Sequence, residues 1–141
     1  MAKVLLVDDE KDFRDVLAER MSNRGLETDT AESGIKALEM IEAKSYDAII
    51  LDLAMPEMDG IETLKRLLEK QPQLQVIVLT GQATVQKGVE AVKLGAADFL
   101  EKPAEIESLV AKIEEAQAKK LSLFEQNLDQ KISDITRKKS W

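Results

Sequence analysis

A lone acidic residue follows a continuous apolar stretch in the first half of the chain. Residues 48–51 read Ala-Ile-Ile-Leu, Asp52 follows them, and Pro56 comes shortly after. A short, continuous apolar run bounded by turn residues predicts a strand buried on both faces, as in a parallel sheet. Asp52 would then lie at the carboxyl end of that strand, the edge where open α/β sheets bind ligands. It is the first candidate for chemistry.

Three other apolar runs also end in polar side chains. The residues that follow these runs are Asp8, Asp9, Thr80 and Lys102. Taken singly, each has a simple structural role: the acids can cap a helix, the hydroxyl can satisfy a turn, and the lysine can be a solvated cation. Because the carboxyl ends of parallel strands share one edge of the sheet, we expect these side chains to converge with Asp52.

The elements that would position these residues alternate along the chain. Strands are expected at residues 4–7, 26–30, 48–52, 76–79 and 97–100, each followed by a helix, the last one beginning near Glu105. The second strand is more polar and predicts a sheet edge. Ser33 is expected to cap the second helix, and Val16 and Ile35 are expected on the apolar faces of the first two. This alternation predicts an α/β fold, a doubly wound five-stranded parallel sheet with helices on both faces.

Three converging carboxylates would repel each other strongly at separations of ~4–6 Å. A hard divalent cation removes that repulsion, and Mg²⁺ prefers a few carboxylate or carbonyl oxygens together with waters. The Thr80 hydroxyl and the Lys102 ammonium, aimed at the same place, would neutralise the equatorial oxygens of a phosphoryl group during its transfer to a carboxylate.

The spaced motifs together resemble the receiver domain of bacterial two-component response regulators, over roughly residues 3–115. The motifs are Asp8-Asp9, Asp52 with Met55-Pro56 and Asp59-Gly60, Thr80, Gly95-Ala96 and Lys102-Pro103. The resemblance implies a flavodoxin-like sheet of strand order 2-1-3-4-5.

The resemblance also implies a role for each site residue. Asp52 would be the phospho-acceptor, Asp8 and Asp9 would hold Mg²⁺ with Asp52 and the backbone carbonyl of Ala54, Thr80 would be the switch hydroxyl, and Lys102 would pair with the phosphate. Phe99 occupies the place of an aromatic switch residue, although a buried strand aromatic explains it equally well. The family often has a cis peptide at the position of Lys102-Pro103.

The sequence departs from the family pattern in a few places. Ala104 stands where the family commonly has Phe, so the docking of the last helix is in question. Ala54 and Gln82 occupy variable positions that the family links to the lifetime of the phosphorylated state. None of these departures touches the five chemical positions.

Composition excludes several classes of function. The chain has no histidine and no cysteine, which excludes histidine-based catalysis, phosphohistidine donation and disulfides. No apolar run approaches membrane-spanning length, and the N-terminus lacks the basic-then-apolar pattern of a signal peptide. The absence of cysteine favours a cytoplasmic location, which we therefore expect. Residues 1–115 hold 14 basic and 24 acidic residues, a net of −10, so nucleic acid is not an expected partner.

Residues 116–141 lie beyond the resemblance and are expected to form a helical extension or linker, with residues 1–115 as the receiver domain. A helix from Glu105 to about Ile135 would run ~46 Å. Its apolar residues recur with 11-residue offsets, typical of a nearly straight helix, and are expected to continue the core-facing side. A homodimer through this helix is the simplest partner; a frayed extension is the alternative.

The expected function is that of a stand-alone receiver, which takes phosphate from a histidine kinase or phosphotransfer protein and switches a surface for a downstream protein target. Apart from Mg²⁺-dependent self-phosphorylation and dephosphorylation, no enzymatic activity is expected. One alternative is the receiver fragment of a larger transcriptional regulator. Another is a Mg²⁺-dependent phosphohydrolase, but such enzymes usually carry a second acid two residues after the nucleophile, where this chain has Ala54.

Overall fold

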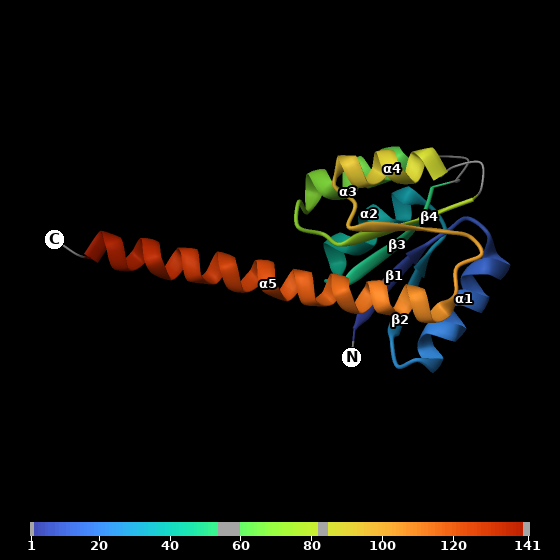
Figure 1. Cartoon of the computed structure of the whole chain (residues 1–141), viewed down its shortest axis with the longest axis horizontal. Helices are drawn as coiled ribbons and strands as arrows, with labels where there is room; N and C mark the ends of the chain where they lie inside the picture. The colour runs from blue at the N-terminus through green and yellow to red at the C-terminus, as the bar shows by residue number, and fades with distance from the viewer. Residues whose placement is uncertain (1, 54–59, 82–84, 140–141) are drawn as a thin grey trace.

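The structure, a computed structural model, describes residues 2–53, 60–81 and 85–139, with side chains as far as residue 136. Strands and helices alternate through the described chain (Figure 1). The elements are β1 Lys3–Val7, α1 Lys11–Asn23, β2 Glu27–Ala31, α2 Gly34–Ala43, β3 Ala48–Asp52, α3 Gly60–Lys70, β4 Val76–Thr80, α4 Val85–Leu94, β5 Asp98–Glu101 and α5 Ile106–Lys139. The strands form one parallel sheet of order β2-β1-β3-β4-β5, as predicted.

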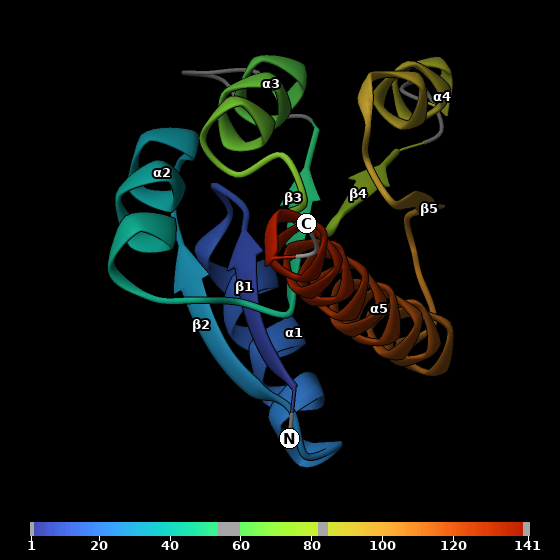
Figure 2. The ribbon, with the colours of Figure 1, turned by 90° about the vertical axis from the view of Figure 1, so that its left-hand side faces the viewer.

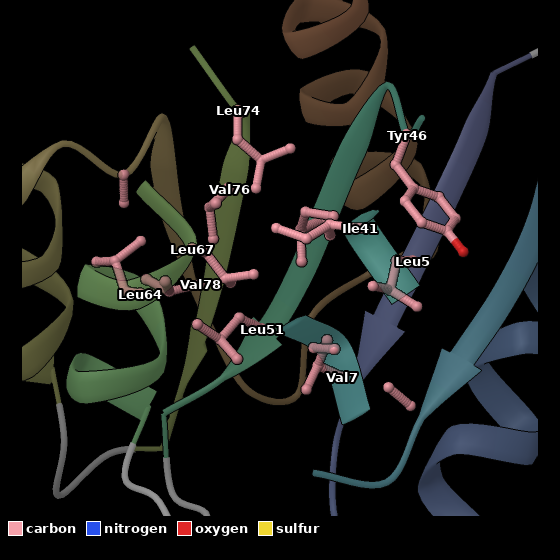
Figure 3. Packing of buried hydrophobic residues seen from close by; sticks show 14 of the residues in the cluster. Leu5, Val7, Ile41, Tyr46, Leu51, Leu64, Leu67, Leu74, Val76 and Val78 are labelled. Atoms are coloured by element: carbon pink, nitrogen blue, oxygen red, sulfur yellow. The ribbon is translucent and has the colours of Figure 1, made fainter. Parts of the chain in front are cut away.

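The sheet is covered by helices on both faces (Figure 2). Alternate strand residues such as Leu5 and Leu51 pack under α2, α3 and α4, and Figure 3 shows this core from close by. The residues between them, such as Leu6 and Ile50, pack against α1 and α5. The strands β1, β3 and β4 are therefore apolar on both faces, whereas β2 lies at the edge and is mostly polar, as its sequence predicts.

Two local predictions on the first helices have different outcomes. The Ser33 hydroxyl accepts a hydrogen bond from the Lys36 backbone N–H at 3.1 Å and caps α2, as predicted. The placement of Val16 and Ile35 on the core face is wrong, since these side chains are 50% and 54% exposed. Val16 precedes the buried Met21 by five positions and Ile35 precedes the buried Ile41 by six, which places them roughly 120–140° around each helix from these core residues.

Helix α5 runs for 34 residues and extends far beyond the rest of the domain (Figure 1). Its core-facing line, which includes Leu109 and Ile113, ends at Ala116. Polar contacts then hold its next turns against the domain, among them the hydrogen bonds that Lys120 Nζ donates to the Tyr46 carbonyl at 2.8 Å and that Asn127 donates to Gln73 at 3.2 Å. No helix in the described part of the chain is both long enough and apolar enough to cross a membrane.

The second half of α5 carries an exposed apolar stripe. Its residues are Leu121, Phe124, Leu128, Ile132 and Ile135, each at least 47% exposed. At about 100° per residue these side chains share an arc of about 80°, whose centre lies roughly 90° from the core-facing line. The expectation that the stripe continues the core-facing side is therefore wrong. The stripe lies to one side of that line, and its first residues, Leu121 and Phe124, border the domain beside Asp47 and Tyr46.

Candidate functional site

The strand register brings the predicted site residues to one edge of the sheet. Val7 pairs with Leu51, so Asp8 and Asp52 follow adjacent strand positions. On the other side of β3, Asp52 pairs with Leu79, next to Thr80. The backbone N–H of Lys102 donates to the Thr80 carbonyl at 2.6 Å, which holds the start of the loop after β5 at the same edge. The peptide bond between Lys102 and Pro103 is cis.

Three carboxylates meet at this edge. Ligand oxygens of Asp8, Asp9 and Asp52 lie within 4.8 Å of one another. Asp8 and Asp52 are buried, at 1% and 5% exposure, and Asp9 is exposed. Asp8 Oδ1 accepts the backbone N–H of Glu10 at 2.8 Å, whereas Asp8 Oδ2 is buried and makes no hydrogen bond. A buried carboxylate oxygen that lacks a donor, facing two further carboxylates, fits the oxygen ligands of a divalent cation.

The electrostatics of the cluster reflect this crowding. Burial is the main cause that raises the pKa of Asp8 to about 6, and the nearby Asp52 charge raises it further. The Glu10 N–H and the Lys102 ammonium oppose this rise in pKa. A cation placed among these carboxylates would favour the ionised form of Asp8, because it would replace a repulsion with an attraction.

Lys102 is the cation that faces these acids. Its Nζ lies 3.2 Å from Asp52 Oδ2 and 3.5 Å from Asp8 Oδ2, and its side chain is 28% exposed. The same Nζ lies 4.3 Å from the centroid of the Phe13 ring. In the sequence, Phe13 has the helical spacing of an ordinary apolar core residue, which does not predict this contact. One feature of the sequence could have indicated the contact: Phe13 lies in the first turn of the helix that directly follows the acid pair Asp8-Asp9, and therefore near the site.

The two residues predicted as switch elements lie on the adjacent strands β4 and β5. Thr80 is fully buried, and its hydroxyl donates to the Leu100 carbonyl at 3.5 Å, a long hydrogen bond. Phe99 is partly buried and packs against the core beneath α2, α3 and α4. Both side chains therefore lie between the site edge of the sheet and α4.

Part of the predicted site lies outside the described residues. This applies to Ala54, Met55, Pro56, Asp59 and Gln82.

Gly60, the first residue of α3, lies against the end of β3. Its N–H donates to the Leu53 carbonyl at 3.1 Å, and a β-carbon at this position would lie only 2.3 Å from Leu53 Cα. This close approach requires glycine.

The chain is similar to known proteins over most of its length. The sequence profile of the response regulator receiver domain family matches residues 4–114. The response regulator MprA of Mycobacterium leprae is 31% identical over 149 residues, which cover 99% of this chain and 65% of that protein. The DNA-binding transcriptional regulator NtrC of Escherichia coli K12 is 37% identical over 113 residues, which cover 80% of this chain and 24% of that protein.

Solved structures give the same result. The crystal structure of a response regulator receiver domain protein from Clostridium thermocellum matches with a TM-score of 0.84 at 30% identity, over 87% of this chain and 99% of that one. The sheet order, the convergence of the acids with Lys102 and these similarities agree. The chain belongs to the response regulator receiver domain family and is a receiver domain of two-component signalling.

Proposed function

We propose that Asp52 accepts a phosphoryl group, and that the residues around it bind and neutralise that group. The observation that carries the proposal is the placement of Asp52 at the end of the central strand β3, with Lys102 Nζ 3.2 Å from its Oδ2. Asp8 lies at the same edge, and one of its oxygens accepts the Glu10 N–H at 2.8 Å.

The proposed cation ligands are Asp8, Asp9, Asp52 and the backbone carbonyl of Ala54. Mg²⁺ suits such a set of oxygens, and when bound it would neutralise negative charge on the phosphoryl oxygens. The lack of a hydrogen bond at the buried Asp8 Oδ2 supports this assignment. Lys102 would pair with a further phosphoryl oxygen, and the Thr80 hydroxyl would turn from the Leu100 carbonyl towards it.

The movement of Thr80 is the proposed switch. Its present hydrogen bond to Leu100 is long, at 3.5 Å, so little is lost when the hydroxyl leaves it. The space that Thr80 vacates would accept the Phe99 ring. The surface that changes would comprise α4, β5 and the start of α5, and it would be read by a downstream protein target.

The proposed phosphodonor is a histidine kinase or a histidine phosphotransfer protein, since the chain has no histidine of its own.

We propose a cytoplasmic location, a receiver domain of residues 1–115 and a helical extension of residues 116–141. The relative NtrC is named a DNA-binding regulator, so the receiver part of a larger transcriptional regulator stays as the alternative. The length of the native reading frame distinguishes a stand-alone receiver from the receiver part of a larger regulator.

The extension is proposed to pair with the α5 of a second copy through the apolar stripe. Burying one such side chain contributes ~1.5–3 kcal/mol, so three buried side chains offset much of the entropy cost of association. The core-facing line of α5 ends at Ala116, and in the described chain the stripe residues stay about half exposed. A second copy supplies an equal stripe, which makes a two-fold pair self-complementary.

The charges that flank the stripe favour parallel pairing. Helical spacing puts Glu125 and Asp129 on one flank and Lys131 on the other. In a parallel two-fold pair, opposite flanks face each other, so the acidic flank of one copy faces Lys131 of the other. In an antiparallel pair, each flank faces its own copy and like charges meet. We therefore propose parallel helices, which would place both receiver domains at the same end of the pair.

The acceptor assignment is tested by mapping the modified residue. Borohydride reduces an acyl phosphate of aspartate to homoserine, which peptide mass spectrometry locates. After incubation with acetyl phosphate and Mg²⁺, homoserine is expected at position 52 and at neither position 8 nor 9. Homoserine at position 8 or 9 with none at 52 would overturn the assignment.

A further inference from the structure

Phe13 forms one wall of the place that Lys102 occupies. The ammonium group of Lys102 lies over the Phe13 ring, with Nζ 4.3 Å from its centroid. This distance is well within the ~6 Å over which an aromatic face attracts a cation. The same ammonium faces Asp52 and Asp8 at 3.2 and 3.5 Å, so carboxylates lie on one side of it and an aromatic ring on another.

The ring is fixed relative to the acids by two contacts of the first turn of α1. The backbone N–H of Glu10 donates to Asp8 Oδ1 at 2.8 Å, and Arg14 Nη1 donates to the Asp8 carbonyl at 2.9 Å. Phe13 lies between these two residues in sequence and packs against the core shared by α1 and α5. Its ring therefore keeps its place when the charges of the site change.

The two attractions on Lys102 respond differently to a bound cation. A divalent cation among Asp8, Asp9 and Asp52 reduces the net negative charge that faces the ammonium and repels the ammonium directly. The attraction of the ring arises from its own quadrupole, so it does not depend on the ionisation of the carboxylates. Once the cation has bound, the three carboxylates and the cation carry a smaller net negative charge, so the ring supplies a larger share of the attraction that holds Lys102 at the edge of the site.

We propose that Phe13 is a positioning residue for Lys102. Its aromatic face keeps the ammonium beside Asp52 in the cation-loaded domain, ready to pair with the incoming phosphoryl group. This inference rests on the proposed function of Asp52 and Lys102. It assigns no contact between Phe13 and the phosphoryl group, and it requires an aromatic face at position 13, whereas a purely structural role requires only apolar bulk.

A double-mutant cycle separates these two roles. Phe13→Leu keeps apolar bulk and removes the ring, and Phe13→Tyr keeps the ring. With saturating Mg²⁺ and acetyl phosphate, Phe13→Leu should slow phosphorylation about two- to fivefold, the range expected for one exposed cation–π contact. Phe13→Tyr should stay near wild type. In a Lys102→Met background the effect of Phe13→Leu should vanish, because the partner of the ring is gone.

A spectroscopic readout does not depend on activity. In the Mg²⁺-saturated, unphosphorylated protein, the ε-methylene protons of Lys102 should show an upfield ring-current shift. This shift should persist in Phe13→Tyr and disappear in Phe13→Leu. Leu17→Ala is the matched control, since Leu17 lies one turn further along α1 and packs against the same core. It should leave both the shift and the phosphorylation rate unchanged.

Equal slowing by Phe13→Leu in the wild-type and Lys102→Met backgrounds would overturn the inference, as would equal slowing by Phe13→Tyr and Phe13→Leu. Asp52→Asn, run in parallel, distinguishes a failure of the proposed role of Phe13 from a failure of the proposed function of Asp52. If Asp52→Asn is not phosphorylated and the cycle is additive, only the role of Phe13 fails. If Asp52→Asn is phosphorylated like wild type, the proposed function itself fails.

Discussion

Gly88 of α4 lies directly against the ring of Phe99. A β-carbon at position 88 would be 2.8 Å from Phe99 Cδ2 and 3.0 Å from Thr80 Cγ2. The two proposed switch side chains therefore meet the same point of α4. Any movement of Phe99 into the place of Thr80 changes what α4 packs against, which gives the proposed switch a direct path to that helix.

The first prediction concerns this contact. Gly88→Ala should lower the free energy of unfolding by about 1 kcal/mol, because overpacking at ~1–3 kcal/mol outweighs the ~1 kcal/mol gained in helix propensity. In a Phe99→Leu background the closest contact is relieved and only the contact with Thr80 Cγ2 remains, so the same change should cost less. Urea denaturation of the four proteins measures both values. An equal cost of Gly88→Ala in both backgrounds would contradict the contact.

The second prediction concerns the pH dependence that Asp8 causes in the metal-free protein. Its pKa is raised to about 6 from an ordinary value of 3.8, so between these pH values the folded state holds more protons than the unfolded state. The contribution of Asp8 to stability is therefore full below pH 3.8 and is lost as the pH rises through 6. At pH 7 the loss amounts to about 3 kcal/mol.

Asp8→Asn removes this pH dependence and keeps an acceptor for the Glu10 N–H. Measured without divalent cations, Asp8→Asn should be more stable than wild type at pH 7, and the difference should shrink by pH 5. Glu69→Gln, a change at an exposed position of α3, is a suitable control for the loss of one negative charge. A difference between Asp8→Asn and wild type that is the same at both pH values would be inconsistent with the raised pKa.

The third prediction concerns Tyr46 and Asp29, far from the site edge. The Tyr46 hydroxyl donates to Asp29 Oδ2 at 2.8 Å, and this hydrogen bond is the main cause that lowers the pKa of Asp29. A lowered pKa stabilises the fold at pH values above the ordinary value of 3.8, and this stabilisation is lost as the pH falls through the lowered pKa.

Tyr46→Phe should therefore cost about 1 kcal/mol at pH 7, less at pH 3, and raise the pKa of Asp29 in an NMR titration. Lys44→Met tests the contribution of the other partner of Asp29, an exposed lysine 3.2 Å away, and should have a smaller effect. If the pKa of Asp29 is the same in Tyr46→Phe and wild type, the hydrogen bond does not determine it.

The fourth prediction concerns pairing through α5. The chain has no cysteine, so single cysteines report the orientation cleanly. Parallel, in-register helices place the two copies of residue 135 together, so Ile135→Cys should form a disulfide-linked dimer on mild oxidation. Antiparallel helices centred on Leu128 would instead link a Leu121→Cys chain to an Ile135→Cys chain. Ser122→Cys, beside the stripe, is the control.

Truncation after Gln117 removes the stripe and should give a monomer that still accepts phosphate. Sedimentation that shows a monomer at high concentration for the full chain, with and without phosphate, would exclude the pairing.

The fold and most of the site follow from local sequence patterns. Apolar runs that end in acids or a hydroxyl predict both the parallel sheet and the shared edge, because strand direction alone determines where those residues lie. The contact of Lys102 with Phe13 could not be predicted in this way. It depends on how α1 and the loop after β5 pack across the sheet, and Phe13 looks like any core residue in the sequence.

The course of α5 was predictable only in part. Its length follows from the absence of Gly and Pro after residue 103. The orientation of the stripe does not, because apolar spacing describes a face but not the direction in which it points. The contact between Lys120 and the Tyr46 carbonyl joins residues 74 positions apart and fixes that direction.

The most direct test of the account is the intact mass of the protein after incubation with acetyl phosphate. Wild type should gain the mass of one phosphoryl group when Mg²⁺ is present and none when it is removed by a chelator. Asp52→Asn should gain none under either condition, while Glu69→Gln should behave like wild type. Full labelling of Asp52→Asn, or labelling of wild type that does not depend on Mg²⁺, would contradict the central claim.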